Sequence, residues 1–189
     1  MSELDQLLLD IEHAESLSHA RKDWHPNNSG NIDIRIAADG TWFHEGRPFQ
    51  RTALVKLFAS VLRREGDIHY LVTPAEKLAI QVDDAPFVAT TMETLNSDAE
   101  QAITFTTTLG DSIIADSNHP IRVDIDQASQ QPKPYIHFRD GLDALISRTA
   151  FFDLANIAQE VKRNGHTDLT VWSMGIEFTL GSCNDSFNN

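Results

Sequence analysis

Two arginine–threonine–alanine steps each stand at the beginning of an apolar segment. The segments are RTALVKLF, which starts at Arg51, and RTAFFDLA, which starts at Arg148. Both have the apolar spacing of a helix, and the free N–H groups at the beginning of a helix bind phosphate or carboxylate readily. A guanidinium adds a two-pronged donor for such an anion, and the hydroxyls of Thr52 and Thr149 can cap the helix or donate to an anionic oxygen. The pattern therefore predicts a binding site for a small anion.

The same two arginines have a structural alternative. Each follows a predicted hairpin with an aspartate in its turn, so that Arg51 could pair with Asp39 and Arg148 with Asp140. Structural ion pairs often occupy such positions, and this pairing is the preferred interpretation of each arginine taken alone. The two interpretations differ in what the guanidinium groups contact, which a structure can decide.

Four further residues complete the predicted ligand site. Arg139 adds a third cation, and Trp42 offers a ring for stacking, with burial in the core as the alternative for this tryptophan. Asp83 and Asp84 end a strand and would accept hydrogen bonds from a ribose or bind a cation, although an exposed turn is the preferred interpretation of the pair. Trp172 shares an alternating pattern with apolar neighbours, and we predict that it packs in the core.

Charge and composition limit the classes of partner. The chain has 189 residues, of which 41% are hydrophobic, and a formal net charge of -13. Such a charge disfavours binding to nucleic acid polymers and to anionic membranes. The segment from Gly46 to Arg64 nevertheless contains several basic residues and no acidic one. This local reversal of charge favours a small anionic ligand, with a solvated basic surface as the alternative.

Other features predict a cytoplasmic protein without a recognised catalytic motif. No apolar run is long enough to span a bilayer, the N-terminus MSELDQLLLD is acidic, and the lone Cys183 excludes an intramolecular disulfide. The sequence contains no phosphate-loop, dinucleotide-binding, nucleophile-elbow or zinc-protease motif, and its eight histidines are scattered. We therefore predict no catalytic residues and no metal site, leave the cofactor unassigned, and regard an enzymatic role as the less favoured one.

Periodicity predicts the elements of the first half of the chain. Ser2–Ser16 has the spacing of an amphipathic helix, with Ser2 as its cap. Alternation at Ile32–Ile36, a turn at ADGT and the segment WFHEG predict a hairpin. The apolar residues of 54–61 predict a helix that ends at RREG, with the two arginines in its last turn and the glycine just beyond. Strands are then predicted at HYLVTP, KLAIQV and DDAPFVATT.

The second half repeats these elements in a shifted order. Strands are predicted at AITFTTT, SIIA and IRVDID, followed by QASQQPKP as a linker. PYIHFRDGLDALI predicts a hairpin with an Asp-Gly turn, 151–158 a helix that ends near RNGH, and 172–180 one closing strand. The matching Asp-Gly turns and Arg-Thr-Ala steps indicate an internal duplication.

The predicted fold class is therefore α+β, with two related units, each a small and mostly antiparallel sheet with one helix. The predicted boundaries are 1–22 for an N-terminal helical arm, 23–95 and 96–183 for the two units, and 184–189 for a polar tail.

Four blocks of the sequence occur in a recognisable order. They are DGTWFHEGRPFQRTALVKLFASVLRRE, YLVTPAEKLAIQVDDAPFVA, FRDGLDALISRTAFFDLA and VWSMGIEFTLGS, and they span most of residues 30–182. Together they resemble the bacterial family catalogued as domain of unknown function 1285. The resemblance implies a duplicated core, a second domain like the pleckstrin-homology barrel, and a groove between the domains for a nucleotide-like ligand in signalling. Because a shared fold does not confer function, the function must still be inferred from the individual residues.

The leading hypothesis is a cytoplasmic ligand-binding regulator. In it, Arg51, Arg148 and Arg139 hold a small anionic, nucleotide-like ligand between the two units, and Trp42 provides the stacking surface. The alternative is a protein–protein interaction module without a small-molecule ligand, in which a strand edge or the N-terminal helix binds a signalling partner. A third hypothesis, an enzyme acting on a phosphorylated small molecule with Asp83 or Asp84 as base, needs a positioned acid–base pair.

Overall fold

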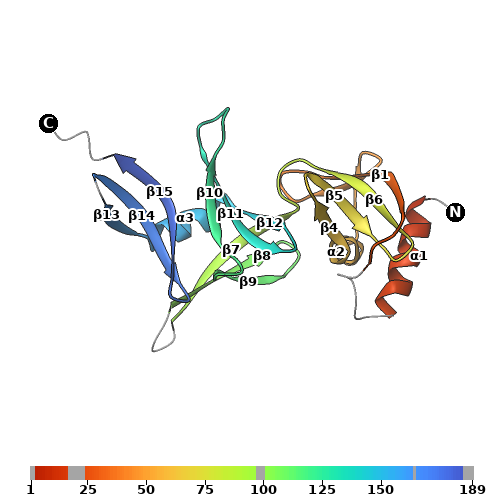
Figure 1. Ribbon diagram of the computed structural model, residues 1–189, viewed down its shortest axis with the longest axis horizontal. Helices are drawn as coiled ribbons and strands as arrows, with labels where there is room; N and C mark the ends of the chain where they lie inside the picture. The colour runs from red at the N-terminus through yellow and green to blue at the C-terminus, as the bar shows by residue number, and fades with distance from the viewer. Residues whose placement is uncertain (1–2, 17–23, 97–100, 164, 185–189) are drawn as a thin grey trace. The chain divides into compact units, whose positions relative to one another are not determined.

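The computed structural model describes residues 3–16, 24–96, 101–163 and 165–184, and they form two compact units. The first unit is Met1–Pro86 and the second is Phe87–Asn189 (Figure 1). The described residues contain three helices and fifteen strands, as the α+β prediction requires. The predicted polar tail, 184–189, lies outside them apart from Asn184, which ends the last strand, and the predicted cap Ser2 also lies outside them.

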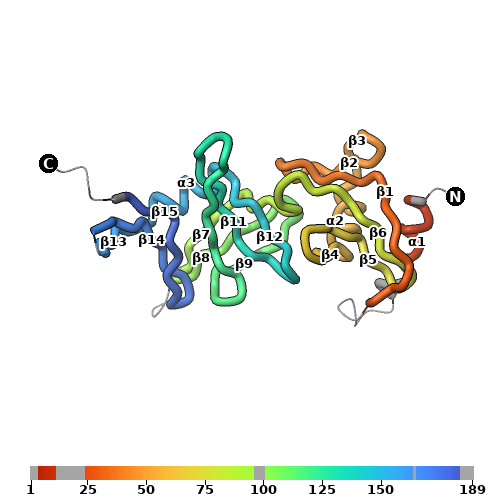
Figure 2. Tube along the Cα trace, turned by 45° about the horizontal axis from the view of Figure 1, so that its top comes forward, coloured from red at the N-terminus to blue at the C-terminus, as the bar shows by residue number. Residues whose placement is uncertain are grey.

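The first unit contains two helices and one six-stranded sheet. The helices are α1 (Glu3–Ser16) and α2 (Thr52–Ser60). The strand order across the sheet is β3-β2-β1-β6-β5-β4, and β1 pairs with β6 in parallel while the other neighbours are antiparallel (Figure 2). The strands are β1 (Asn28–Ile36), β2 (Trp42–His44), β3 (Arg47–Pro48), β4 (Leu62–Glu65), β5 (Ile68–Val72) and β6 (Glu76–Val82).

Apolar periodicity explains the core of this unit. The alternating isoleucines of β1 are buried, and α2 buries Val55 and Phe58 on one face. Trp42 is only 3% exposed and stacks on Phe58, with ring centroids 6.4 Å apart. Helix α1, which the sequence predicts, buries Leu7 completely. The apolar face of α1 therefore packs against the rest of the protein at this residue.

The predicted end of the second helix is wrong. The helix stops at Ser60, and the segment LRRE forms β4, which pairs with β5 so that Arg63 lies opposite Tyr70. Gly66 has a φ of 61°, but it serves the turn of the β4–β5 hairpin rather than a helix end. A glycine with positive φ is equally favourable at the end of a helix and in a hairpin turn, which explains why the sequence predicted the wrong structure.

The second unit contains helix α3 (Arg148–Asn156) and two sheets. A six-stranded sheet has the order β10-β11-β12-β7-β8-β9, in which β12 and β7 are parallel, and a three-stranded antiparallel sheet has the order β13-β14-β15. The strands are β7 (Phe87–Asn96), β8 (Gln101–Thr107), β9 (Ser112–Ile114), β10 (Ile121–Ile125), β11 (Pro132–Arg139), β12 (Leu142–Ile146), β13 (Gln159–Arg163), β14 (His166–Ser173) and β15 (Ile176–Asn184).

The two sheets of the second unit meet where β14 reaches β8. The buried Ser173 hydroxyl donates to the Ala115 carbonyl at 2.6 Å and accepts from the Ile103 N–H at 2.9 Å. The Met174 N–H donates to the Gln101 carbonyl at 2.9 Å. These bonds link the six-stranded sheet to the three-stranded one.

Four sequence predictions in this unit need correction. QASQQPKP is not a linker, because it forms the turn of the β10–β11 hairpin and the start of β11. Helix α3 ends at Asn156, so that Ala158 lies outside it, and of the segment RNGH, Arg163 ends β13 and His166 begins β14. The segment 172–180 is two strands joined by a turn at Met174–Gly175, and Trp172 is 46% exposed rather than buried.

The order of elements supports the predicted duplication, although the strands pair differently. A hairpin, a helix and three antiparallel strands occur as β1–β2, α2 and β4–β6, and again as β11–β12, α3 and β13–β15. In the first unit β6 returns to pair with β1, whereas in the second β12 takes β7 as its parallel neighbour. Because β7 pairs with β8 and β12, the division falls after Pro86, earlier than the predicted residue 95.

None of the helices among the described residues has the length and apolar character needed to cross a membrane.

Candidate functional site

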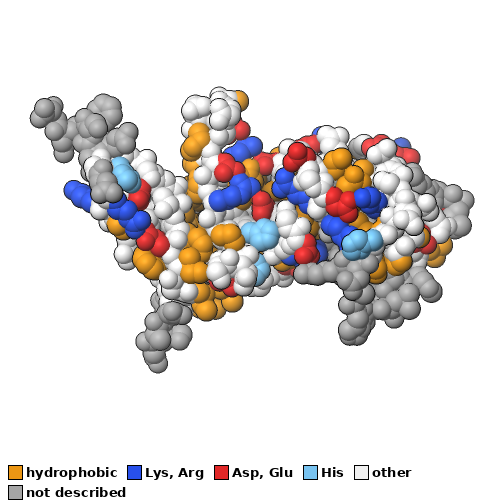
Figure 3. All heavy atoms as spheres, in the orientation of Figure 1, with side chains coloured by type: hydrophobic (Ala, Val, Ile, Leu, Met, Phe, Trp, Pro, Cys, Tyr) orange, Lys and Arg blue, Asp and Glu red, His pale blue; other side chains and the backbone are white. Residues whose placement is uncertain are grey.

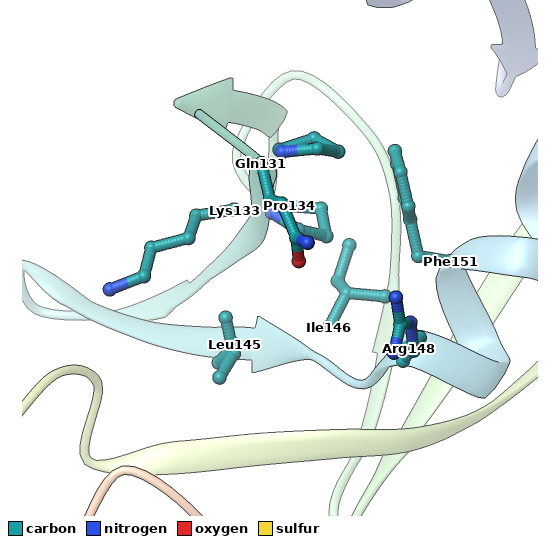
Figure 4. A pocket seen from close by; sticks show the side chains of 8 residues that line it. Gln131, Lys133, Pro134, Leu145, Ile146, Arg148 and Phe151 are labelled. Carbon is teal, nitrogen blue, oxygen red and sulfur yellow. The ribbon is translucent and has the colours of Figure 1, made fainter. Parts of the chain in front are cut away.

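A pocket of about 360 Å³ lies beside the beginning of α3 (Figure 4). Its walls come from the base of the β10–β11 hairpin, from the end of β12 and from the first turn of α3. The lining residues are Gln131, Pro132, Lys133, Pro134, Leu145, Ile146, Arg148 and Phe151. All of them belong to the second unit.

The pocket exists because β11 extends beyond β12. The pairing of the two strands runs only as far as Tyr135 opposite Leu145, so that the first residues of β11 have β10 as their neighbour but not β12. Pro132 and Pro134 stand on this uncovered stretch. Proline lacks an N–H group and therefore tolerates a strand edge without a partner. After Ile146 the chain turns into α3. The pocket lies between the uncovered start of β11 and the first turn of α3.

Arg148 brings to this pocket a guanidinium that has no partner among the described residues. It is the first residue of α3, and Ser147 caps the helix by accepting a hydrogen bond from the Ala150 N–H at 3.2 Å. The Arg148 side chain is exposed and makes no hydrogen bond or ion pair with any residue that the structure describes. The first turn of α3 contains no acidic residue that could compensate its charge. An anion from solution is the partner that this guanidinium fits.

The second cation of the pocket already has a partner. Lys133 lies 3.4 Å from a carboxylate oxygen of Asp126, and Figure 4 shows its side chain pointing away from Phe151. The Ser129 backbone N–H and hydroxyl, assisted by Lys133, lower the pKa of Asp126 from 3.8 to about 2. Asp126 is therefore ionised at neutral pH and neutralises much of the charge of Lys133.

Comparison with known proteins assigns the chain to a family. The model of the domain of unknown function DUF1285, N-terminal domain, matches residues 21–85, and the model of the protein of unknown function DUF1285, C-terminal domain, matches residues 86–180. The chain belongs to the DUF1285 family. Helix α1 lies outside the matched residues, and the two matches meet within one residue of the division between the structural units.

Two crystal structures of DUF1285 family proteins are similar to this one. The protein from Silicibacter pomeroyi is 44% identical, with 92% of this chain and 93% of that chain covered and a TM-score of 0.81. The protein from Shewanella baltica is 26% identical, with 65% and 90% covered and a TM-score of 0.52. The comparison with curated proteins finds no match. The family supports the fold, so function must be argued from the site.

Of the residues predicted in the second unit of this DUF1285 protein, only Arg148 lines the pocket. Thr149 follows it on the exposed surface of α3. Arg139 comes six residues after Lys133 on β11, which at about 3.4 Å per residue places it about 20 Å along the strand. There its guanidinium lies over the rings of Phe138 and Phe87, 5.2 and 5.8 Å from their centroids. The structure therefore does not bring Arg139 to Arg148.

Arg51 and Thr52 stand at the beginning of α2 in the first unit. Arg51 has an extended backbone and occupies the cap position, where no side chain caps the helix, and Thr52 is the first helical residue. Arg148 occupies the first helical position instead, so the two Arg-Thr-Ala steps are offset by one residue at their helices. Both arginines are exposed.

The predicted ion pairs between these arginines and the hairpin aspartates do not form. Within the described residues the guanidinium of Arg51, like that of Arg148, has no carboxylate partner. The Asp39 carboxylate instead accepts the Thr41 N–H of its own turn at 2.9 Å, and this bond lowers the pKa of Asp39. The preferred structural interpretation of the two arginines is therefore wrong.

The remaining predicted residues of the first unit have structural contacts. The ring of Trp42 is buried against Phe58, so the core alternative holds for it and it offers no stacking surface. Asp83 forms an ion pair with Arg35 at 3.2 Å, which ties the end of β6 to β1. Asp84 is half-buried at the end of the unit. Figure 3 likewise shows basic side chains beside acidic ones on the visible face.

The described residues contain no group of three or more histidine, cysteine or carboxylate side chains that could hold a metal ion.

Most pocket residues were missed by sequence reasoning. The sequence predicts Phe151 only as a helix residue, and the low hydrophobicity of the segment QQPKP predicts a linker. Two prolines on either side of a lysine are the signal that could have indicated an uncovered strand edge. The contact between this edge and the beginning of α3 depends on strand register, which the sequence does not display.

Proposed function

We propose that this DUF1285 protein is a cytoplasmic regulator that binds a small anionic ligand in the pocket beside α3. The observation that carries the proposal is the exposed guanidinium of Arg148, which lacks a partner among the described residues and borders a pocket of about 360 Å³. Pockets of this size are typical of small-molecule sites. The signalling role that the family resemblance implies belongs to the same proposal.

The charge of the protein supports a local rather than a general affinity for anions. A net charge of -13 repels anions at long range, so an anion is held only where a cation stands without a carboxylate neighbour. Arg148 meets this condition, and its planar fork offers two parallel hydrogen bonds to a phosphate or carboxylate. Binding there should raise the melting temperature by mass action.

The lining supports binding rather than catalysis. The described residues of the pocket wall include no carboxylate, histidine, serine or cysteine, which are the usual general bases and nucleophiles. The remaining titratable group, Lys133, is engaged by Asp126. We therefore assign Arg148 to ligand binding and no residue to catalysis.

A thermal-shift screen with mononucleotides, sugar phosphates and small carboxylates tests the proposal. At least one member should raise the melting temperature of the wild-type protein, and Arg148→Ala should abolish the rise. Arg51→Ala is the matched control, because Arg51 also begins a helix and also lacks a partner among the described residues but lines no part of this pocket. A rise that survives in Arg148→Ala, or no rise with any compound, would contradict the proposal.

A further inference from the structure

We infer that the pocket beside α3 selects a ligand with one anionic group, a phosphate monoester or a carboxylate, attached to an aromatic ring. This inference rests on the proposed function and narrows its ligand class. The inferred specificity disfavours polyphosphates and inorganic anions without a ring. The inference is based on the distribution of charge and apolar surface around the pocket.

The charge of the lining fits a single anionic group. Of the two cations, Lys133 lies 3.4 Å from the ionised Asp126 and points away from Phe151, which leaves Arg148 as the cation open to a ligand (Figure 4). One guanidinium fork satisfies two oxygens of one phosphate or carboxylate. A polyphosphate would bring further negative charges to an acidic protein without a second open cation in this lining.

The apolar part of the lining fits a ring. Phe151 is half-buried and keeps part of its ring exposed, whereas Pro134 and Ile146 line the pocket with little exposed surface of their own. Figure 4 shows Phe151 across the pocket from Pro134. Aromatic rings bind to such walls by offset stacking and by removal of apolar surface from water.

Helix geometry places the two recognition elements side by side. Arg148 and Phe151 are three residues apart in α3, so they lie on the same face of its first turn with Cβ atoms about 5–6 Å apart. A ring that stacks on Phe151 can therefore carry an anionic substituent to Arg148 without a long spacer. This spacing matches an aryl phosphate or an aryl carboxylate.

Calorimetric titration of the full chain with simple probes tests the ligand class. The probes are phenyl phosphate, benzoate, inorganic phosphate, benzyl alcohol, AMP and ATP. Phenyl phosphate or benzoate should bind at least about tenfold more tightly than inorganic phosphate, because burial of the ring adds to the anionic contact. Benzyl alcohol, which has the ring alone, should bind at least as weakly as inorganic phosphate. ATP should bind no more tightly than AMP. The first two probes distinguish a phosphate from a carboxylate ligand.

Substitutions of neighbouring phenylalanines separate the ring contact from helix stability. Phe151→Ala should weaken phenyl phosphate or benzoate by about tenfold and leave inorganic phosphate unchanged. Phe152→Ala is the matched control, since Phe152 is the next residue of α3, is 66% exposed and does not line the pocket. Phe151→Leu keeps an apolar side chain that supports folding but removes the ring. It should therefore still lose part of the affinity for phenyl phosphate or benzoate.

The outcomes distinguish this inference from the proposed function. If inorganic phosphate or ATP binds as tightly as phenyl phosphate and requires Arg148, an anion site exists and the ring inference is wrong. The ring inference is also wrong if Phe151→Ala and Phe151→Leu bind phenyl phosphate and benzoate with the same affinity as Phe152→Ala. If no probe requires Arg148, the proposed function itself is wrong.

Discussion

The cap of α3 gives a quantitative test of how this helix positions Arg148. Ser147 Oγ accepts a hydrogen bond from the Ala150 N–H at 3.2 Å and donates one to the Thr90 carbonyl at 3.3 Å. The Ser147 N–H also donates to the Ala89 carbonyl at 2.8 Å. The substitution Ser147→Ala removes the two hydroxyl contacts and keeps the backbone bond.

The expected loss of stability follows from these two contacts. An N-cap serine replaced by alanine costs about 1 kcal/mol, and a hydroxyl-to-carbonyl hydrogen bond contributes about 0.5–1 kcal/mol. Ser147→Ala should therefore lower the free energy of unfolding by about 1–2 kcal/mol. For a unit of this size the melting temperature should fall on the order of 5–10 °C.

Urea unfolding followed by circular dichroism measures the effect, and two variants serve as controls. Arg51→Ala at the cap position of α2 should change the free energy of unfolding by less than about 0.5 kcal/mol, because no side chain caps that helix. Ser147→Asp should recover the cap but not the bond to Thr90, since a carboxylate accepts and does not donate. Equal losses for Ser147→Ala and Arg51→Ala would refute the asymmetry between the two helices.

Two further predictions concern titration and burial. The Asp126 carboxyl should titrate near pH 2 by NMR, and Ser129→Ala should raise its pKa toward 3.8; because the folded-state pKa is the lower one, the stabilisation from Asp126 is present above about pH 4 and is lost as the pH falls toward 2. A carboxyl that titrates at 3.8 in the wild-type protein would contradict this. Trp42→Ala should cost about 3–5 kcal/mol in urea unfolding and Trp172→Ala about 1 kcal/mol or less, since the first ring is 3% and the second 46% exposed; similar costs would show that our assignment of the core is wrong.

Local turn chemistry predicted part of the fold well. Asp140 and Gly141 have φ values of 49° and 77°, the two successive positive values that a two-residue hairpin turn requires, and the Asp-Gly pair indicated this hairpin directly. The beginnings of α2 and α3 also lie within one residue of the predicted Arg-Thr steps. These features depend on a few adjacent residues, which the sequence displays.

Features that depend on strand register could not be predicted in the same way. Trp172 and Phe178 are an even number of residues apart and would share a face of one continuous strand. A turn at Met174–Gly175 instead places Ser173 opposite Ile176, so Val171, and not Trp172, lies on the face of Phe178. The pocket has the same origin, since it exists where the pairing between β11 and β12 stops.

The central claim is that an anion binds to Arg148 in the pocket beside α3. An NMR titration that follows the assigned arginine Nε–H resonances during addition of phenyl phosphate tests it most directly. We predict a saturable shift of the Arg148 resonance, with Arg51 and Arg139 unmoved at the same concentrations. An unmoved Arg148, or equal shifts at all three arginines, would contradict the claim.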